Sequence, residues 1–527
     1  MTSILTTCNV VEYHLTITNE TIAPDGVERL GLLINGQFPG PAIEANWGDT
    51  IIVHLTNAMQ DNGTSLHFHG MRQFGSNEMD GVPSITQCAL APGDSMTYKF
   101  VATNYGTSWY HSHWGLQTFD GVFGPMIIHG PSSKEYDVDA GPIVLSDWNH
   151  VSVNEIYDSI QQTTSRPGAP TLDTGLINGK NVWGNGGERF EMEFESGKAY
   201  LLRLVNCAIQ ATFKFSLDGH KFWVVSTDFV PIVPYETDSL TINIGQRYNI
   251  IVVADQTPSA YWMRADNQLS CSPITQYDDI KAIVRYKDAN QGLVSGLVSN
   301  LTSVQGSCAD EPAASLVPVV AHTVGPQSDN IHENVLVGPG PSTPNLYKWT
   351  LNGATFQSQW GDPTLNHILD NGTVPDYSGQ LAIEIPELGE WVYIIIETPI
   401  PVPHPIHLHG HDFYVLTSGI GPWTGDTSVF QLNNPPRRDV AMMPGGAGPA
   451  GAGGHLVLAF YTDNPGAWLM HCHIGWHAQM GFALQIIENL EGIKKTEVDT
   501  CKMQETCKNW HSYTNQANIF TMPDSGI

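Results

Sequence analysis

The most informative stretch of this chain is His471-Cys472-His473-Ile474-Gly475-Trp476-His477-Ala478. Successive side chains of a β-strand point to opposite faces of the sheet. If this segment forms a strand, Cys472 faces one side, while His471 and His473 face the other. The stretch therefore predicts a thiolate metal site, which His477 can join, and a second site built from histidines, with the polypeptide itself linking the two.

Three further histidine motifs accompany this stretch, and the four together hold ten of the 21 histidines. They are His67-Phe68-His69, His111-Ser112-His113 and His404-Pro405-Ile406-His407-Leu408-His409. A single His-x-His pair is most often a solvated strand face, but four motifs with one cysteine make a ligand set. Imidazole with one thiolate suits copper, and two histidines with one cysteine is the blue-copper pattern. A closed zinc site would use cysteine pairs at short spacing, and this sequence has none.

Composition limits the classes of partner. The chain has 527 residues, 41% of them hydrophobic, so its length indicates several domains with ample apolar cores. Lys and Arg number 23 against 52 Asp and Glu, and the formal net charge of −29 argues against nucleic acid or anionic membrane partners. No apolar run approaches the roughly 20 residues of a membrane-spanning helix. We expect a monomer without nucleic-acid or membrane partners.

Short β-branched segments bounded by Gly, Pro, Asn or Asp predict an all-β chain. Examples are residues 50–55, 200–205 and 391–396. An apolar-Asn-Gly turn recurs at Asn35, Asn178 and Asn352, at intervals of 143 and 174 residues. Repeats at this spacing predict three homologous β domains, each a sandwich or barrel.

We place the three domains at residues 1–132, 133–315 and 316–527. The histidine motifs fall in the first and third domains only. A cluster that draws ligands from both must therefore lie at their interface, and its formation should be coupled to folding. The middle domain is expected to act as a spacer and as one wall of a substrate pocket.

The cysteines and glycosylation sequons indicate the cellular location. Eight cysteines include the proposed ligand Cys472, which leaves an odd number for disulfides. Asn-x-Ser/Thr sequons favour a secreted glycoprotein, and they occur at Asn19, Asn62, Asn300 and Asn371. The first 20 residues lack the pattern of a signal peptide. Either the chain is a mature secreted form with an added Met1, which we favour, or the protein is not secreted.

Several longer segments point to a known family. They are Asn46-Trp47-Gly48-Asp49, Tyr105-Gly106-Thr107-Ser108-Trp109-Tyr110-His111-Ser112-His113, Asn434-Pro435-Pro436-Arg437-Arg438-Asp439 and Thr462-Asp463-Asn464-Pro465-Gly466-Ala467-Trp468. With the histidine motifs, they make the chain resemble the multicopper oxidases, and specifically the ascomycete-type fungal laccases, over nearly its whole length. The resemblance implies three cupredoxin-like Greek-key β domains and four copper ions, namely one type 1, one type 2 and a type 3 pair.

By motif position, the resemblance also implies the division of ligands among the coppers. Type 1 takes His404, Cys472 and His477; type 2 takes His67 and His407; type 3 takes His69, His111, His113, His409, His471 and His473. Phe482, ten residues after Cys472, stands where many relatives carry an axial Met and others a Leu. Phenylalanine cannot ligate, so we expect a three-coordinate type 1 copper with a raised potential.

The resemblance extends to the C-terminus and the disulfides. The chain ends Asp524-Ser525-Gly526-Ile527, like the processed tail that enters a channel to the trinuclear cluster in these laccases. Ile527 is therefore expected to be part of a plug, the alternative being a frayed terminus. Cys88 is expected to bridge to Cys507, and Cys271 to Cys308. The pairing stays open for Cys8, Cys207 and Cys501.

The implied activity is one-electron oxidation of small phenolic or aromatic donors beside His477. It is coupled, through Cys472, to the four-electron reduction of dioxygen to water. Asp228 is expected to accept the proton that a phenol loses, although it could instead cap a turn. Asp80 is expected to relay protons to the oxygen-reducing cluster, although Asp-Gly is equally an ordinary turn.

Other functions remain open at this stage. A dedicated phenol-coupling multicopper oxidase of secondary metabolism would carry identical copper motifs and differ only in its pocket walls. A ferroxidase is less favoured, because Asp228 is the single acid we can assign near His477. A cupredoxin protein without catalysis would lack ligands, yet all ten histidines and Cys472 are present. A hydrolase is not supported, since no Gly-x-Ser-x-Gly elbow occurs.

Overall fold

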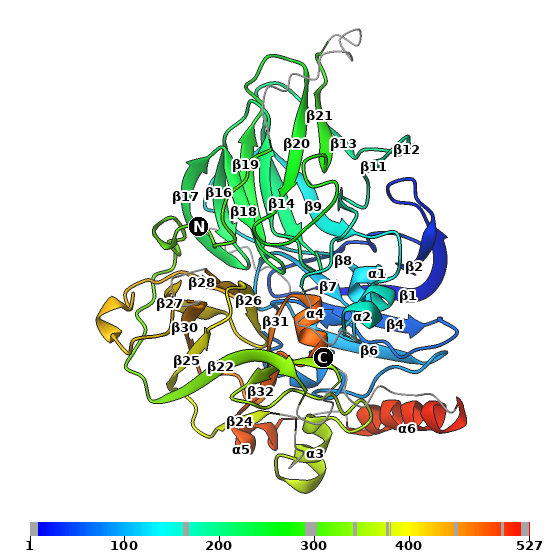
Figure 1. The fold of residues 1–527 in the computed structure, drawn as a ribbon, viewed down its shortest axis with the longest axis vertical. Helices are drawn as coiled ribbons and strands as arrows, with labels where there is room; N and C mark the ends of the chain where they lie inside the picture. Colours follow the sequence, from blue (N-terminus) through cyan, green and yellow to red (C-terminus); the bar gives the residue numbers. More distant parts are fainter. Residues whose placement is uncertain are drawn as a thin grey trace.

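The computed structural model describes residues 9–161, 168–289, 303–340, 345–375, 379, 381–446, 452–496, 500–517 and 526–527. Within these ranges the chain forms three β-sandwiches of two main sheets each, grouped side by side (Figure 1). In Figure 1 the first domain is blue to cyan, the second lies above it in green, and the third is yellow to orange. The predicted all-β fold is confirmed.

The first domain packs a sheet of order β2-β1-β4-β6 on a sheet of order β3-β8-β7-β5. Its strands are β1 (Val10–Ile22), β2 (Arg29–Ile34), β3 (Ile43–Asn46), β4 (Thr50–Asn57), β5 (His67–Phe68), β6 (Ser95–Val101), β7 (Gly106–His111) and β8 (Phe123–His129). The antiparallel register of β5 and β7 sets His67 opposite His111. Strand pairing therefore brings two of the histidine motifs together within this domain.

The second domain has a six-stranded sheet, β10-β9-β14-β19-β16-β17, and a five-stranded sheet, β13-β21-β20-β15-β18. The first consists of β9 (Val138–Trp148), β10 (Thr174–Ile177), β14 (Ala199–Asn206), β16 (Phe222–Thr227), β17 (Val230–Thr237) and β19 (Arg247–Val253). The second consists of β13 (Glu191–Phe194), β15 (Phe213–Leu217), β18 (Ser239–Ile242), β20 (Ala260–Asn267) and β21 (Lys281–Tyr286). A small hairpin, β11 (Val182–Trp183) and β12 (Gly186–Gly187), lies beside them.

The third domain has a sheet of order β23-β22-β25-β30-β27-β28 and another of order β24-β32-β31-β26-β29. Its strands are β22 (Asp329–Pro339), β23 (Tyr347–Leu351), β24 (Ala382–Ile385), β25 (Trp391–Thr398), β26 (His404–Leu408), β27 (Phe413–Ile420), β28 (Arg437–Arg438), β29 (Val440–Met443), β30 (Gly454–Tyr461), β31 (Gly466–Cys472) and β32 (Ala483–Glu488). Strands β26 and β31 pair antiparallel, with His407 opposite His471 and Ile406 opposite Cys472. The remaining two histidine motifs thus lie on neighbouring strands.

The helices are mostly short and lie between strands or at domain edges. They are α1 (Gln117–Asp120), α2 (Val153–Gln161), α3 (Thr364–Asn371), α4 (Gly475–Gln479), α5 (Leu490–Ile493) and α6 (Thr500–Ala517). Within the described residues, no helix combines the length and apolar character needed to cross a membrane. Helix α4 follows β31 directly and carries His477.

The three Asn-Gly turns predicted as a repeat share one conformation. Asn35, Asn178 and Asn352 have φ of 54°, 49° and 48°, and the glycine after each also has positive φ. Each Asn side chain accepts a hydrogen bond from a backbone N–H of a preceding strand, with distances of 2.7, 2.6 and 3.1 Å. Asn and Gly tolerate the left-handed region, so this local sequence forms the same turn in each domain.

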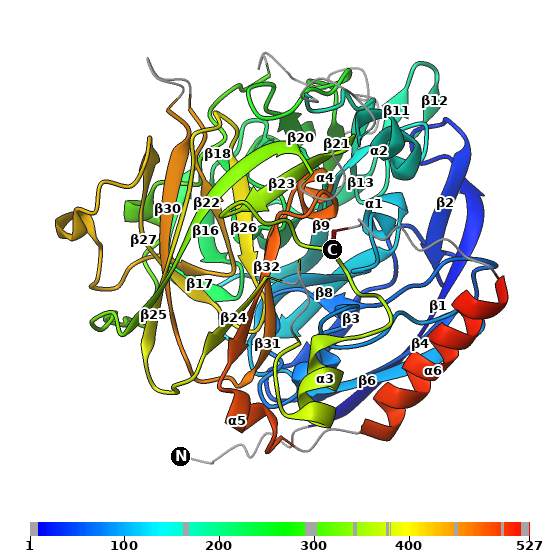
Figure 2. The same ribbon diagram turned by 60° about the horizontal axis from the view of Figure 1, so that its bottom comes forward.

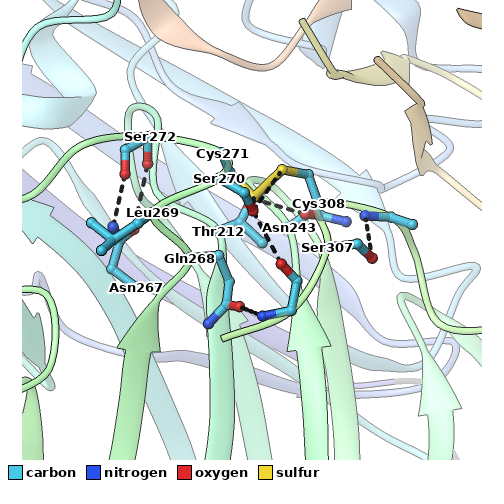
Figure 3. Close-up of a disulfide and its surroundings, with 12 residues drawn as sticks. Thr212, Asn243, Asn267, Gln268, Leu269, Ser270, Cys271, Ser272, Ser307 and Cys308 are labelled. Carbon is cyan, nitrogen blue, oxygen red and sulfur yellow. Dashed lines mark hydrogen bonds between the residues drawn. A yellow bond between two sulfur atoms is a disulfide. The ribbon is translucent and has the colours of Figure 1, made fainter. Parts of the chain in front are cut away.

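The C-terminal helix α6 returns to the first domain, where it lies beside β4 and β6 in Figure 2. The disulfide Cys88–Cys507 fixes it there, and Asn509 donates a hydrogen bond to Asp94 at 2.9 Å. The second predicted bridge, Cys271–Cys308, is also present (Figure 3). Both predicted pairings are confirmed.

Three cysteines had no predicted partner. Cys207 and Cys501 form no disulfide within the described residues, and Cys207 is buried. Cys8 lies outside the described residues, as do Met1, the sequon at Asn300 and the tail residues Asp524 and Ser525.

Candidate metal centres

The first candidate centre lies in the third domain, where β26, β31 and α4 bring His404, Cys472 and His477 together. The Cys472 sulfur lies 3.6 Å from Nδ1 of both histidines, and the two Nδ1 atoms are 3.1 Å apart. His404 and Cys472 are buried, whereas His477 is partly exposed. Three donor atoms therefore converge on one point beneath the protein surface.

Burial keeps the donor groups of this centre neutral in the absence of a metal ion. Burial raises the pKa of the Cys472 thiol well above its usual range, so the free thiol keeps its proton. Burial lowers the pKa of His477 to about 3, so its imidazole is neutral and able to ligate. A metal ion would stabilise the thiolate by displacing that proton.

Two aromatic side chains cover the centre. The Phe482 ring lies 5.1 Å from the ring of His404, and its role as a non-ligating axial residue stays a prediction. The Trp349 ring lies 4.4 Å from His477 and 4.8 Å from His404. The sequence analysis did not identify Trp349, because no motif surrounds it. Together these rings keep water away from the donor atoms.

The second candidate centre contains eight histidines, four from the first domain and four from the third. They are His67, His69, His111, His113, His407, His409, His471 and His473, and all are buried. His67 stacks on His409 at 4.0 Å between ring centroids, and His69 stacks on His407 at 3.9 Å. Each stacked pair joins one domain to the other. The predicted location at the domain interface thus agrees with the geometry.

Hydrogen bonds fix the orientation of several of these rings. The Nδ1 atoms of His67 and His407 lie 2.7 Å from the backbone carbonyl oxygens of Asp80 and Asp439, respectively. A ring that donates Nδ1–H to an acceptor presents the lone pair of Nε2, which is the arrangement common among metal-bound histidines. His471 follows the same pattern toward its neighbouring carbonyl at 3.0 Å.

The remaining ring nitrogens fit a metal cluster. Among the described residues, none makes a hydrogen bond to the buried Nε2 atoms of His67, His111, His113, His407, His409 and His471. Burial lowers the pKa of His471 to about 4 and that of most of the others well below the usual range. Buried nitrogens without a partner are costly. Neutral imidazoles that face one another without protons suit a group of metal ions.

Asp80, predicted to act near the oxygen-reducing cluster, lies at this second centre. Its carboxylate is fully buried, with Oδ2 2.8 Å from His409 Nδ1 and Oδ1 3.2 Å from His67 Nδ1. The same residue therefore orients one histidine from each domain. Among the described residues, none makes a hydrogen bond to Oδ1.

A second acid, Asp439, was not identified from the sequence. Its carboxylate lies 3.3 Å from His69 Nε2 and is held by Arg247, whose Nη2 donates to Oδ2 at 2.6 Å. Burial raises the pKa of Asp439 to about 6, against the opposing effect of Arg247. In the sequence, Arg437-Arg438-Asp439 belongs to a segment that resembles the family, and nothing in that segment indicates this contact between domains.

The surroundings of Asp228 differ from those expected of a proton acceptor for phenols, and that role stays a prediction. Its side chain is fully buried and accepts hydrogen bonds from Nε of Arg438 at 3.2 Å and from the backbone N–H groups of Arg247 and Asp439 at 3.0 and 3.1 Å. Burial raises its pKa, but Arg438 and Arg247 outweigh that effect and lower it. This carboxylate is 1% exposed and faces the two arginines rather than solvent. Asp228 ties the second domain to the backbone that holds His407.

The second domain does approach His477, through another loop. Trp476 Nε1 donates to Gln210 Oε1 at 2.7 Å, and Gly475 N–H donates to the carbonyl of Ile209 at 3.0 Å. Gln210 Nε2 donates to the carbonyl of Pro170 at 2.8 Å. The side chain that the middle domain places next to the helix of His477 is therefore the neutral Gln210. No sequence motif predicted this contact.

Ile527 lies at the second centre, as the resemblance implied. It is 3% exposed and lines a cavity of about 30 Å³ together with His111, His113, His471 and His473. Gly526 N–H donates to the Gln479 carbonyl at 2.8 Å, and Ser358 Oγ donates to the Gly526 carbonyl at 2.9 Å. The last two residues are therefore anchored.

Comparison with known families agrees with this geometry. Sequence models of the multicopper oxidase family match residues 16–133, 139–289 and 340–491. The chain belongs to the multicopper oxidase family. It is thus a copper-binding oxidoreductase, and the resemblance found in the sequence is confirmed. The domain boundaries near residues 132 and 315 stay predictions.

Individual relatives give further detail. Laccase-2 of Botryotinia fuckeliana is 45% identical over 98% of this chain and 88% of its own length. The crystal structure of the Botrytis aclada laccase has a TM-score of 0.90 and 42% identity, covering 99% of this chain and 95% of that one. Dihydrogeodin oxidase of Aspergillus terreus is 38% identical over 98% of this chain and 90% of its own length. The likenesses confirm the cupredoxin-like fold and favour laccase over a dedicated coupling enzyme.

Proposed function

We propose that this protein has laccase activity: one-electron oxidation of small phenolic or aromatic donors, coupled to the four-electron reduction of dioxygen to water. The observation that carries the proposal is the position of Cys472, whose sulfur faces His404 and His477 while its chain neighbours His471 and His473 lie in the eight-histidine cluster. The backbone of residues 471–473 thus joins a set of one sulfur and two nitrogen donors to a set made of nitrogen donors alone.

The donor sets support copper as the bound metal. One thiolate with two imidazoles, and a cluster made of imidazoles alone, suit copper. We propose four ions with the predicted division: type 1 on His404, Cys472 and His477, type 2 on His67 and His407, and a type 3 pair on the other six histidines. When bound, copper supplies one-electron redox chemistry at the first centre and dioxygen reduction at the second.

The protein itself selects where the donor binds. His477 is partly exposed, whereas the other nine histidines of the two centres are buried. A phenol can therefore approach the edge of His477 without access to the histidine cluster. Trp476 and Gln210 hold this edge in place through their 2.7 Å hydrogen bond.

Proton supply at the second centre is assigned to Asp80. Its buried Oδ1 makes no hydrogen bond to the described residues, while Oδ2 is held by His409. Such a carboxylate could accept a proton that arrives from bulk solvent and hold it at Oδ1, beside the space between the histidine rings. The small cavity that Ile527 lines would admit dioxygen or water only, so we propose that the C-terminus limits access as a plug.

We infer that the protein is a secreted, glycosylated monomer. Three of the sequon asparagines, Asn19, Asn62 and Asn371, are exposed. The charge of −29 keeps such a protein dispersed. Mass spectrometry of protein purified from culture medium would identify the glycans, and light scattering would give the mass. Absence from the medium would contradict secretion.

The function is tested by oxygen uptake of copper-loaded protein with a panel of donors. The panel contains simple methoxyphenols, a dye that loses an electron without a proton, ferrous iron and polycyclic phenols. Laccase activity predicts uptake with both the small phenols and the dye. Uptake with one bulky phenol alone would indicate a dedicated coupling enzyme, and uptake with ferrous iron alone would indicate a ferroxidase.

A further inference from the structure

A second group of metal-ligating side chains lies on the surface of the first domain, on the sheet β2-β1-β4-β6. Glu12 and His14 are two residues apart on β1 and so share one face. Strand β4 runs parallel to β1, with His54 directly opposite His14. The two imidazole rings stack with centroids 4.6 Å apart and an angle of 18° between their planes.

The donor atoms of these residues converge on one oxygen. Glu12 Oε1 lies 2.7 Å from His54 Nε2 and 3.7 Å from His14 Nε2, and the three ligand atoms all lie within 4.8 Å of one another. Zinc binds histidine nitrogen and carboxylate oxygen at about 2.0–2.2 Å, so two of its ligand atoms are at most roughly 4.3 Å apart. Small side-chain rotations would therefore place all three atoms around one ion.

A fourth residue orients one of the imidazoles. Thr97, opposite His54 on β6, places Oγ1 2.9 Å from His54 Nδ1. With Nδ1–H donated to this oxygen, Nε2 points its lone pair at the Glu12 carboxylate. That tautomer leaves Nε2 free to bind a cation beside Glu12. Such an outer hydrogen bond, which fixes the tautomer of a ligand, is the usual second partner of metal-bound histidine. Without a cation, the other tautomer donates Nε2–H to Glu12 Oε1 and accepts the Thr97 hydroxyl at Nδ1.

We propose that Glu12, His14 and His54 form a site for a divalent transition ion such as Zn²⁺, separate from the copper centres. Two imidazoles and one carboxylate leave positions that water can fill, as in other sites with this ligand set. The side chains of His14 and Glu12 are 75% and 54% exposed, so the ion would exchange freely with solvent. Bound metal would join β1 to β4 and stabilise the folded domain by mass action.

The test is equilibrium dialysis of the full-length, copper-loaded enzyme against Zn²⁺, with zinc and copper counted in each sample. One zinc per chain is expected beyond any that replaces copper. Loss of an outer hydrogen-bond partner of a metal-bound histidine weakens metal binding roughly 10–100-fold, and Thr97→Val should weaken zinc binding within that range. The variants His14→Gln and His54→Gln remove a ligand and should weaken zinc binding by more. His332→Gln, which removes an exposed histidine 2.9 Å from Glu397, is the matched control and should bind zinc normally.

Zinc binding that is unchanged in both histidine variants would overturn the proposal, as would no zinc binding by the unsubstituted enzyme. His14 is exposed, so the His14→Gln variant is expected to fold. An unfolding temperature equal to that of the unsubstituted enzyme, with both measured without zinc, would establish this. Diffraction at the zinc absorption edge should place one peak between the three side chains. A peak elsewhere would likewise contradict the site.

Discussion

The two copper centres differ in how much of the fold each requires. His404, Cys472 and His477 all belong to the third domain and come from adjacent elements. The eight-histidine cluster takes half of its ligands from the first domain, and its stacked pairs cross the interface. The first centre can form when one domain folds, whereas the second forms only when two domains dock.

The centres also differ in access. The first reaches solvent through the edge of His477, while the second is enclosed by buried rings and by Ile527. This separation lets bulky donors deliver electrons at the surface while dioxygen is reduced out of their reach. Removing a ligand from one centre should therefore leave metal binding at the other centre measurable. Substitutions can be chosen that affect one centre at a time.

The largest effect is expected from Cys472→Ser, which removes the thiolate. Serine cannot replace the soft ligand of the first centre, so donor oxidation should fall to background. The eight histidines keep their positions, and the variant should still bind copper in the cluster. Copper analysis with oxygen uptake checks both statements. Retained phenol oxidation would show that electrons do not pass through Cys472.

Asp80→Ala should affect the second centre alone. Its carboxylate orients His409, and loss of such a partner lowers metal affinity roughly 10–100-fold. Copper titration should show weaker binding at the cluster with the first centre unchanged. Asp61→Ala, which removes an exposed carboxylate of the same domain, serves as the control. Equal weakening at both centres would mean that Asp80 acts on the fold generally.

Asp228→Asn should weaken the docking of the domains. It leaves Arg438 and Arg247 buried with less negative charge, and breaking a buried ion pair costs about 3–5 kcal/mol. Denaturant unfolding should show that loss. Residual activity should fall by the same factor with a phenol and with a proton-free dye. A loss confined to phenols would instead support the predicted role of Asp228 as proton acceptor.

Phe482→Met should change the redox potential of the first centre and leave the second centre unchanged. A thioether near His404 stabilises oxidised copper relative to reduced copper, so the potential of the first centre should fall. Phe482→Leu, which adds no donor atom, should stay close to the unsubstituted protein in a redox titration. An unchanged or higher potential in the Met variant would contradict the non-ligating role assigned to Phe482.

The smallest effect is expected from removal of the last four residues. Loss of Ile527 opens the cavity beside His111 and His473, so the rate of reoxidation by dioxygen should change, while the potential of the first centre stays constant. Rapid-mixing measurements on pre-reduced enzyme would follow this step. Kinetics identical to those of the full chain would mean that the C-terminus merely packs there.

Local pattern was enough to predict much of this molecule. Alternation along β31 correctly separated Cys472 from its two neighbours, and the Asn-Gly repeat formed the same turn in each domain. The contact between Asp228 and Arg438 was not predicted, because the two residues lie 210 positions apart and the sequence around Asp228 gives no sign of it. Trp349 and Gln210 were missed for the same reason, since only tertiary packing brings Trp349 to His477 and Gln210 to Trp476.

The most direct test of the two-centre account is diffraction at the copper absorption edge, from crystals of protein loaded with four equivalents of copper. We predict one peak among His404, Cys472 and His477, and three peaks within the eight-histidine cluster. A missing peak at Cys472, or copper in the cluster bound by histidines of one domain alone, would contradict the account.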